Sequence, residues 1–162
     1  MNPKLLIVFF VLILTSCSRK VKETFIIPNG FEGRIAIIFN QPFAEPIPIE
    51  NGRRIYRIPN DGILISSSKL ESGWIDQEYY YVDSQGRQSK IPVQNKDSKE
   101  IPEKPTVIVY GITGVYGNSS ESNPLDFAES IIVSKTSNDS IFNPTSLKEF
   151  ESHIMKKTGR TF

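Results

Sequence analysis

The sequence predicts a mainly β fold, a small antiparallel β-sandwich with one C-terminal α-helix. Short runs of β-branched and aromatic residues alternate with Gly, Pro, Asn and Asp, which is the pattern of strands joined by tight turns. One segment near the C-terminus repeats apolar residues at helical spacing. The chain has 162 residues and one cysteine, so the fold must rest on a hydrophobic core and not on disulfides.

The N-terminus has the organisation of a lipoprotein signal peptide. Lys4 precedes an unbroken apolar run from Leu5 to Leu14, and the sequence Leu14-Thr15-Ser16-Cys17 follows it. A helix of that run would extend only about 15 Å, half of a ~30 Å hydrocarbon core, so an uncleaved membrane helix is disfavoured. We therefore expect residues 1–16 to be removed and Cys17 to be lipidated at the start of a short tether, residues 17–23.

Residues 24–162 are expected to form a single β-rich domain. The predicted strands are Phe25–Ile27, Arg34–Phe39, Arg54–Ile58, Ile63–Ser67, Gln77–Val82, Arg87–Val93, Thr106–Tyr110 and Ile131–Val133. The prolines of Gln41–Pro48 favour an edge or a loop there. Asn51-Gly52 predicts a two-residue hairpin, and Pro59–Gly62 and Asp83–Gly86 predict turns after which the chain returns.

Two further stretches are expected to be loops. Gln94–Lys104 is polar, charged and interrupted by proline, and Gly111–Asn123 is rich in Gly, Ser and Asn. Neither has the apolar periodicity of a core element.

The predicted helix covers residues 146–158. Ser146 and Glu149 have the spacing of a capping box. Gly159 can end the helix, and the last turn is cationic. One face is apolar, which predicts that the helix covers the sheet; its residues are Leu147, Phe150 and Ile154.

Composition and motifs disfavour several kinds of chemistry. The net charge of +1 argues against a nucleic-acid-binding protein. His153 is the single histidine and lies near no Gly-flanked serine, so we predict no histidine-dependent catalysis and no metal site. The glycines at 111, 114 and 117 lack the lysine and the following helix of a phosphate loop. We therefore assign no catalytic residue and no cofactor.

Two groups of side chains remain as candidates. The carboxylates of Glu71, Asp76, Glu78 and Asp83 lie close together in the sequence, and Asp76 and Glu78 share one face of a predicted strand. They allow a carboxylate-dependent hydrolase acting on envelope glycan or peptide, for which a glycosidase would need two carboxyl groups about 5 to 9.5 Å apart. Turn formation and solubility are the competing explanation.

Aromatic residues form the second group, which is a candidate binding surface for protein or glycan. Its members are Trp74, Tyr79, Tyr80 and Tyr81. Tyr79 and Tyr81 share one strand face and Tyr80 takes the other, so one face is expected in the core and the other exposed. Core filling explains the same residues without any ligand.

The stretch from Phe25 to about Pro92 resembles an uncharacterised domain family of bacterial lipoproteins. The resemblance rests on Ile27–Gly33, Tyr56–Leu64, Gly73-Trp74 and Tyr79–Val82, and Gly111–Gly114 extends it. The order of strands and turns is also similar to prealbumin-type β-sandwich modules. These are turn and strand residues, so the resemblance implies a fold and no active site.

The lipoprotein resemblance also implies a location. Ser18, and not an aspartate, follows Cys17, which implies delivery to the outer membrane with the domain facing the periplasm. The function we expect is that of a lipid-anchored, non-enzymatic binding or structural module of the cell envelope, with the hydrolase as the alternative. The partners implied are the membrane, through the acyl chains, and an envelope protein or glycan.

Overall fold

The computed structural model describes residues 20–94, 98, 100–117, 124–137 and 139–160. Cys17 and the predicted signal peptide lie outside the described residues. The elements follow the order β1 (Val21–Pro28), β2 (Gly33–Ile38), β3 (Ile49–Glu50), β4 (Arg53–Arg57), β5 (Ile63–Ile65), β6 (Ile75–Val82), β7 (Gln88–Ile91), β8 (Thr106–Tyr116), β9 (Leu125–Val133), the 3-10 helix η1 (Asp139–Phe142) and α2 (Pro144–Thr158).

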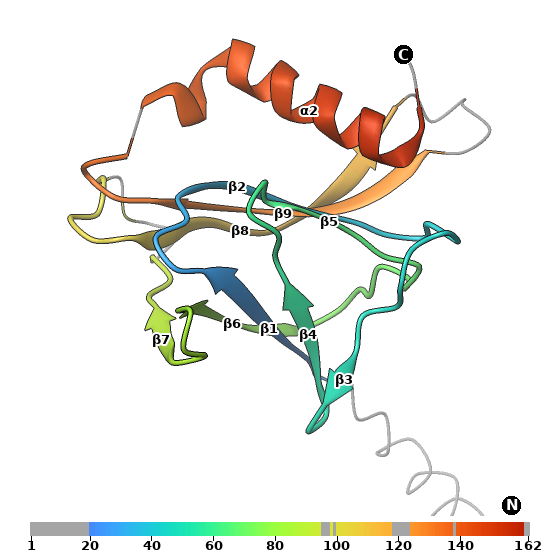
Figure 1. Ribbon diagram of the computed structural model, residues 1–162, viewed down its shortest axis with the longest axis horizontal. Helices are drawn as coiled ribbons and strands as arrows, with labels where there is room; N and C mark the ends of the chain where they lie inside the picture. Colours follow the sequence, from blue (N-terminus) through green and yellow to red (C-terminus); the bar gives the residue numbers. More distant parts are fainter. Residues whose placement is uncertain (1–19, 95–97, 99, 118–123, 138, 161–162) are drawn as a thin grey trace, which may run out of the picture.

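The strands form two sheets, and α2 lies along the outer side of one of them (Figure 1). The first sheet has the order β3-β4-β1-β6-β7, and the second has the order β5-β2-β9-β8. The prediction of a mainly β fold with a C-terminal α-helix is confirmed. No helix among the described residues is long and apolar enough to cross a membrane.

The expectation of purely antiparallel sheets is wrong. The central strand β1 pairs in parallel with both β4 and β6, and β2 pairs in parallel with β5. The turn Pro59–Gly62 does not form a hairpin, because it carries the chain from β4 in the first sheet to β5 in the second. Asn51-Gly52 does form the predicted two-residue hairpin, with positive φ at both residues.

Strand β8 continues through part of the predicted loop. Its pairing with β9 extends to Tyr116 and Leu125, with register shifts between Val107 and Val109 and between Val109 and Ile112. These irregularities break the regular alternation of a strand, so the sequence pattern hides it. The rest of that loop, residues 118–123, lies outside the described residues.

Side chains from both sheets meet in one buried cluster. The first sheet supplies Phe25, Ile27, Tyr56, Tyr79, Tyr81 and Ile91, and the second supplies Ile35, Ile37, Val107 and Ile132. Phe25 stacks between Tyr56 and Tyr79, at ring-centroid distances of 4.8 and 4.5 Å. Aromatic stacking therefore joins the three central strands of the first sheet on its inner face.

A second cluster lies between α2 and the other face of the second sheet. Ile154 and Met155 of α2 pack with Ala36, Ile38, Ile63 and Leu125, and Phe150 packs against this cluster. The predicted covering of a sheet by the helix is confirmed. Its predicted start is wrong, because the side chain of Asn143 caps the helix by accepting from the Thr145 N–H at 2.9 Å, and Pro144 follows. Ser146 is already inside the helix, whereas the C-terminal cap at Gly159, with φ of 69°, is as predicted.

Candidate functional site

The structure divides the four aromatic residues of the predicted binding surface. Tyr79 and Tyr81 point into the core, so they cannot form part of an exposed surface. The hydroxyl of Tyr81 donates to the carbonyl oxygen of Phe31 at 2.6 Å. Burial, with a smaller contribution from the nearby Glu32 carboxylate, raises the pKa of Tyr81 to about 12. The ring is thus a neutral core residue with a fixed hydrogen bond.

The other two residues are on the outside. Trp74 directly precedes β6, and 80% of its surface is exposed. Tyr80 is half-buried on the outer face of β6, where the Lys90 ammonium lies 5.9 Å from its ring centroid. Trp74 and Tyr80 are therefore the members of the predicted set that remain available to a partner.

The carboxylates of Asp76 and Glu78 share the outer face of the first sheet around the guanidinium of Arg53. Arg53 lies 3.1 Å from Glu78 and 3.7 Å from Asp76. It also donates to the hydroxyl of Thr24 and to the carbonyl oxygen of Glu23, both at 2.7 Å. Arg53 therefore links β4 to β1 and β6 across the outer face.

Each of the two carboxylates has a second cation. The Lys20 ammonium is 3.5 Å from Asp76, and the Lys90 ammonium is 3.4 Å from Glu78. Glu71 pairs with Arg54, and Asp83 caps the turn between β6 and β7 while pairing with Arg87. The predicted acidic group is thus distributed among ion pairs and a turn.

The inner face of the first sheet holds a carboxylate that sequence reasoning missed. Glu23 is only 5% exposed, and its two oxygens accept from the Tyr56 hydroxyl at 2.8 Å and from the Gln77 amide at 2.9 Å. The amide oxygen of Gln77 accepts in turn from the Tyr79 hydroxyl at 3.1 Å. The signal was present in the sequence, since Glu23 stands two residues before Phe25 and so takes the core-facing side of its strand.

These groups form a hydrogen-bonded chain that crosses the interior. The Tyr79 hydroxyl lies 2.9 Å from that of Ser130 in β9, so the chain joins the first sheet to the second. Burial, followed by the charge of Glu23 and its hydrogen bond, raises the pKa of Tyr56. No side-chain nitrogen or oxygen that is fully buried within the described part of the chain lacks a partner. The carboxylate is thus compensated in the way that a buried charge requires.

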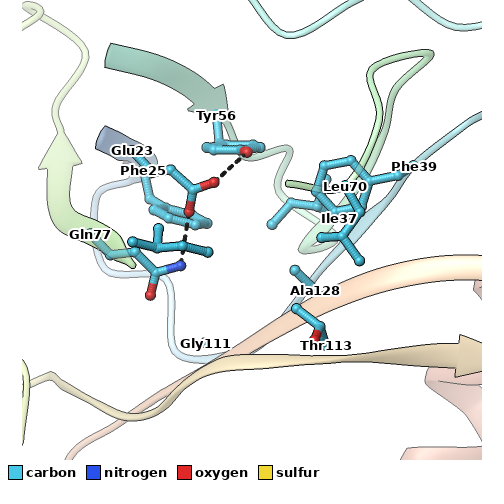
Figure 2. A pocket seen from close by; sticks show the side chains of 11 residues that line it. Glu23, Phe25, Ile37, Phe39, Tyr56, Leu70, Gln77, Gly111, Thr113 and Ala128 are labelled. Atoms are coloured by element: carbon cyan, nitrogen blue, oxygen red, sulfur yellow. Dashed lines mark hydrogen bonds between the residues drawn. The ribbon is translucent and has the colours of Figure 1, made fainter. Parts of the chain in front are cut away.

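A small cavity of about 10 Å³ lies between the sheets beside Glu23 (Figure 2). Its remaining lining is largely apolar and includes Phe25, Ile37, Phe39 and Leu70. A space of this size holds about one water molecule. This cavity therefore has room for a solvent molecule beside the carboxylate but not for a substrate.

The structure also places two residues that the sequence analysis considered for catalysis and for phosphate binding. His153 is exposed on α2. Gly114 lies in β8, where a Cβ atom would stand 2.9 Å from the ring of Phe127, so this glycine permits close packing. Within the described ranges no three His, Cys, Asp or Glu side chains are arranged to hold a metal ion.

Comparison with known proteins places this fold in context. A crystal structure at 2.75 Å of a candidate lipoprotein from Bacillus anthracis is similar, with a TM-score of 0.59 and 23% sequence identity. The match covers 86% of this chain and 95% of the Bacillus chain. No curated protein matches the sequence.

A family model matches residues 19–141, which include both sheets and end before α2. The match is longer than the resemblance seen from Phe25 to about Pro92, and it includes Glu23, Arg53 and Trp74. The family is described as one of unknown function, DUF6843. The sequence motifs, the extent of this match and the fold agree, and the chain belongs to the family of unknown function DUF6843.

Proposed function

We propose that this chain is a bacterial envelope lipoprotein whose domain acts as a non-enzymatic binding or structural module. In this proposal residues 1–16 are removed and Cys17 carries the acyl chains. The observation that carries it is the sequence Leu14-Thr15-Ser16-Cys17 behind a short apolar run, placed just before the first strand of the domain at Val21. The structural similarity to a candidate lipoprotein from Bacillus anthracis supports the same assignment.

The ion pairs around Arg53 favour a non-enzymatic module over the carboxylate-dependent hydrolase. A carboxylate-dependent glycosidase needs two carboxyl groups that flank the bond to be broken. Asp76 and Glu78 instead each contact two cations on an open face. Their contacts fit a role in joining neighbouring strands.

The anchor is tested by acylation in cells. With an alkyne-bearing fatty acid in the medium, the natural chain should carry the label and migrate as the processed form. Cys17→Ala should lose the label and accumulate with its signal peptide, because the thiol is the attachment point. Ser18→Ala is the matched control and should be labelled normally. A labelled Cys17→Ala chain would overturn the proposal.

The location requires a separate measurement. We place the protein at the outer membrane, facing the periplasm, because Ser18 follows Cys17. Membrane fractionation should recover it with outer-membrane markers, and protease added to intact cells should leave it whole. Digestion on intact cells would contradict the inward-facing orientation.

The hydrolase alternative has its own test. The chain from Cys17 onward should release no soluble fragments from purified cell-wall glycan and peptide. Release that disappears in Glu78→Gln or Asp76→Asn, while Glu50→Gln retains it, would establish the hydrolase instead.

A further inference from the structure

The end of the first sheet from which the tether emerges carries two large exposed apolar side chains. Trp74 is 80% exposed and Ile49 is 68% exposed. The Val21 N–H donates to the carbonyl oxygen of Trp74 at 3.0 Å, so Trp74 lies directly beside the start of β1. Ile49 pairs with Arg54, which pairs with Glu23 of β1 on the opposite side. The two side chains therefore flank the first residues of the domain.

An open groove of about 410 Å³ occupies the same end of the sheet. We call it the tether-end groove; its lining is Lys20, Val21, Lys22, Ile49, Gly52, Arg54, Glu71 and Ser72. Three of these described residues are cations and one is a carboxylate. Figure 1 shows the hairpin between β3 and β4 projecting at this end, on the side where β1 begins. The groove thus combines positive charge with exposed apolar atoms.

The covalent distance to the anchor fixes what this end of the domain meets. Only Ser18 and Arg19 separate Cys17 from Lys20, so Lys20 lies within roughly 11 Å of a lipidated Cys17 even in a fully extended chain. That length is comparable to the headgroup layer of a bilayer. Tryptophan prefers this layer because it has an apolar ring and a polar N–H, and lysine extends its ammonium to the headgroups from the same depth.

We propose that the tether-end groove, with Trp74 and Ile49, rests on the lipid headgroup surface and sets the domain's orientation relative to the membrane. The inference rests on the proposed lipidation of Cys17. Trp74 and Ile49 enter the interfacial layer, and Lys20 and Lys22 contact anionic headgroups. The anchored domain then stands with β1 and β6 pointing away from the bilayer, so α2 and the far ends of the strands remain available to the envelope space.

The chain offers a direct probe, since Trp74 is its single tryptophan and Cys17 its single cysteine. The chain from Cys17 onward is coupled through its thiol to a maleimide lipid in vesicles of phosphatidylcholine, with or without phosphatidylglycerol. Some vesicles also contain lipids with brominated acyl chains, which quench tryptophan at short range. Tethering should shift the Trp74 emission maximum to shorter wavelength. The brominated lipids should reduce the intensity of this emission by roughly half, as expected for an indole at the membrane interface.

Variants identify the surface. Ile49→Ser should weaken the quenching, and the double change Lys20→Ser with Lys22→Ser should abolish the additional quenching caused by phosphatidylglycerol. Phe142→Ser is the matched control, because Phe142 is also exposed but precedes α2, which lies over the other sheet. It should leave the quenching unchanged. All four positions are on the surface, and a circular dichroism spectrum of each variant should match that of the parent.

Two results would overturn the inference. Trp74 emission identical in tethered and free chains would show that this end does not meet the bilayer. Equal quenching on neutral and anionic vesicles would remove the role of the lysines. Because the tether is made chemically, neither result depends on acylation in cells, so a failure of docking and a failure of the lipoprotein proposal are distinguishable.

Discussion

Gly62 lies against the backbone of Arg34 so closely that a Cβ atom at Gly62 would stand 2.2 Å from the Arg34 carbonyl oxygen. Gly62 also has a φ of 76°, in the left-handed region. It ends the turn that takes the chain from β4 to β5, and its carbonyl oxygen accepts from the Ala36 N–H at 2.9 Å. The crossing between the two sheets therefore requires a residue without a side chain at this point.

Gly62→Ala should destabilise the domain by about 3 kcal/mol or more, because it adds a backbone clash to the strain of positive φ. Gly52→Ala is the matched control, since Gly52 has a φ of 74° and open space around its Cβ position. It should cost about 1 to 2 kcal/mol, from backbone strain alone. Denaturant unfolding measures both, and equal losses would refute the close approach to Arg34.

Ile154→Ala should destabilise the domain by about 2 to 5 kcal/mol, the usual cost of truncating a fully buried aliphatic side chain. Ile154 is 0% exposed between α2 and the second sheet. Lys148→Ala, on the exposed side of α2, should change stability by less than about 0.5 kcal/mol. Thermal melts would compare the two, and an unchanged melting temperature for Ile154→Ala would mean that α2 does not cover the sheet in solution.

The Lys157 ammonium pairs with Asp61 and donates to the carbonyl oxygen of Ile63, which ties the end of α2 to the start of β5. Partial burial alone would raise the pKa of Asp61, but the hydrogen bonds from Lys157 and from the Ile63 N–H outweigh it and lower the pKa. A lowered pKa stabilises the fold above the carboxyl's ordinary range, near pH 4, and this contribution is lost as the pH falls through the folded-state pKa.

Lys157→Met should therefore lower stability at pH 7 by less than about 1 kcal/mol, since both groups are partly exposed. The difference from the natural chain should shrink as the pH is lowered below about 4. Lys156→Met, the exposed neighbour, should show no such dependence. Chemical unfolding at a series of pH values measures this, and a difference that is constant with pH would contradict the Asp61 linkage.

Glu23→Ala should destabilise the domain by about 2 to 4 kcal/mol, because it removes the acceptor of the buried Tyr56 hydroxyl and of the partly buried Gln77 amide. Glu50→Ala, which breaks only an exposed pair with Arg57, should cost less than about 0.5 kcal/mol. A double-mutant cycle of Glu23→Ala with Tyr56→Phe should give a coupling energy above about 0.5 kcal/mol. Additive losses would show that the hydrogen bond contributes nothing of its own.

The local elements were predictable because their determinants are local. The Asn51-Gly52 hairpin follows from two residues that tolerate positive φ, and the apolar face of α2 follows from its spacing. The start of the helix predicted from the capping-box spacing of Ser146 is wrong, because Asn143 caps the helix and Pro144 occupies its first position, where proline is favoured.

Strand partners were not predictable in the same way. Parallel pairing of β1 with β4 and β6 joins segments far apart in the sequence, and no short-range pattern encodes the choice of partner. Residues 17–23 are predicted as a tether, but β1 begins at Val21, and strand alternation places Glu23 on the core side. Alternation also separates Tyr80 from the buried Tyr79 and Tyr81, but it does not predict that Trp74 is exposed beside the start of β1.

The central position of β1 determines how the domain bears mechanical load. The tether that we propose at the N-terminus of β1 would transmit tension along the axis of a strand that is bonded on both sides, to β4 and to β6. Backbone hydrogen bonds lie across the strand direction, so the pull loads them together in shear and does not open them one at a time from an edge. Under the proposed lipidation of Cys17, a pull on the acyl anchor therefore acts along a strand that is bonded on both sides, and forced unfolding from this end should be slow.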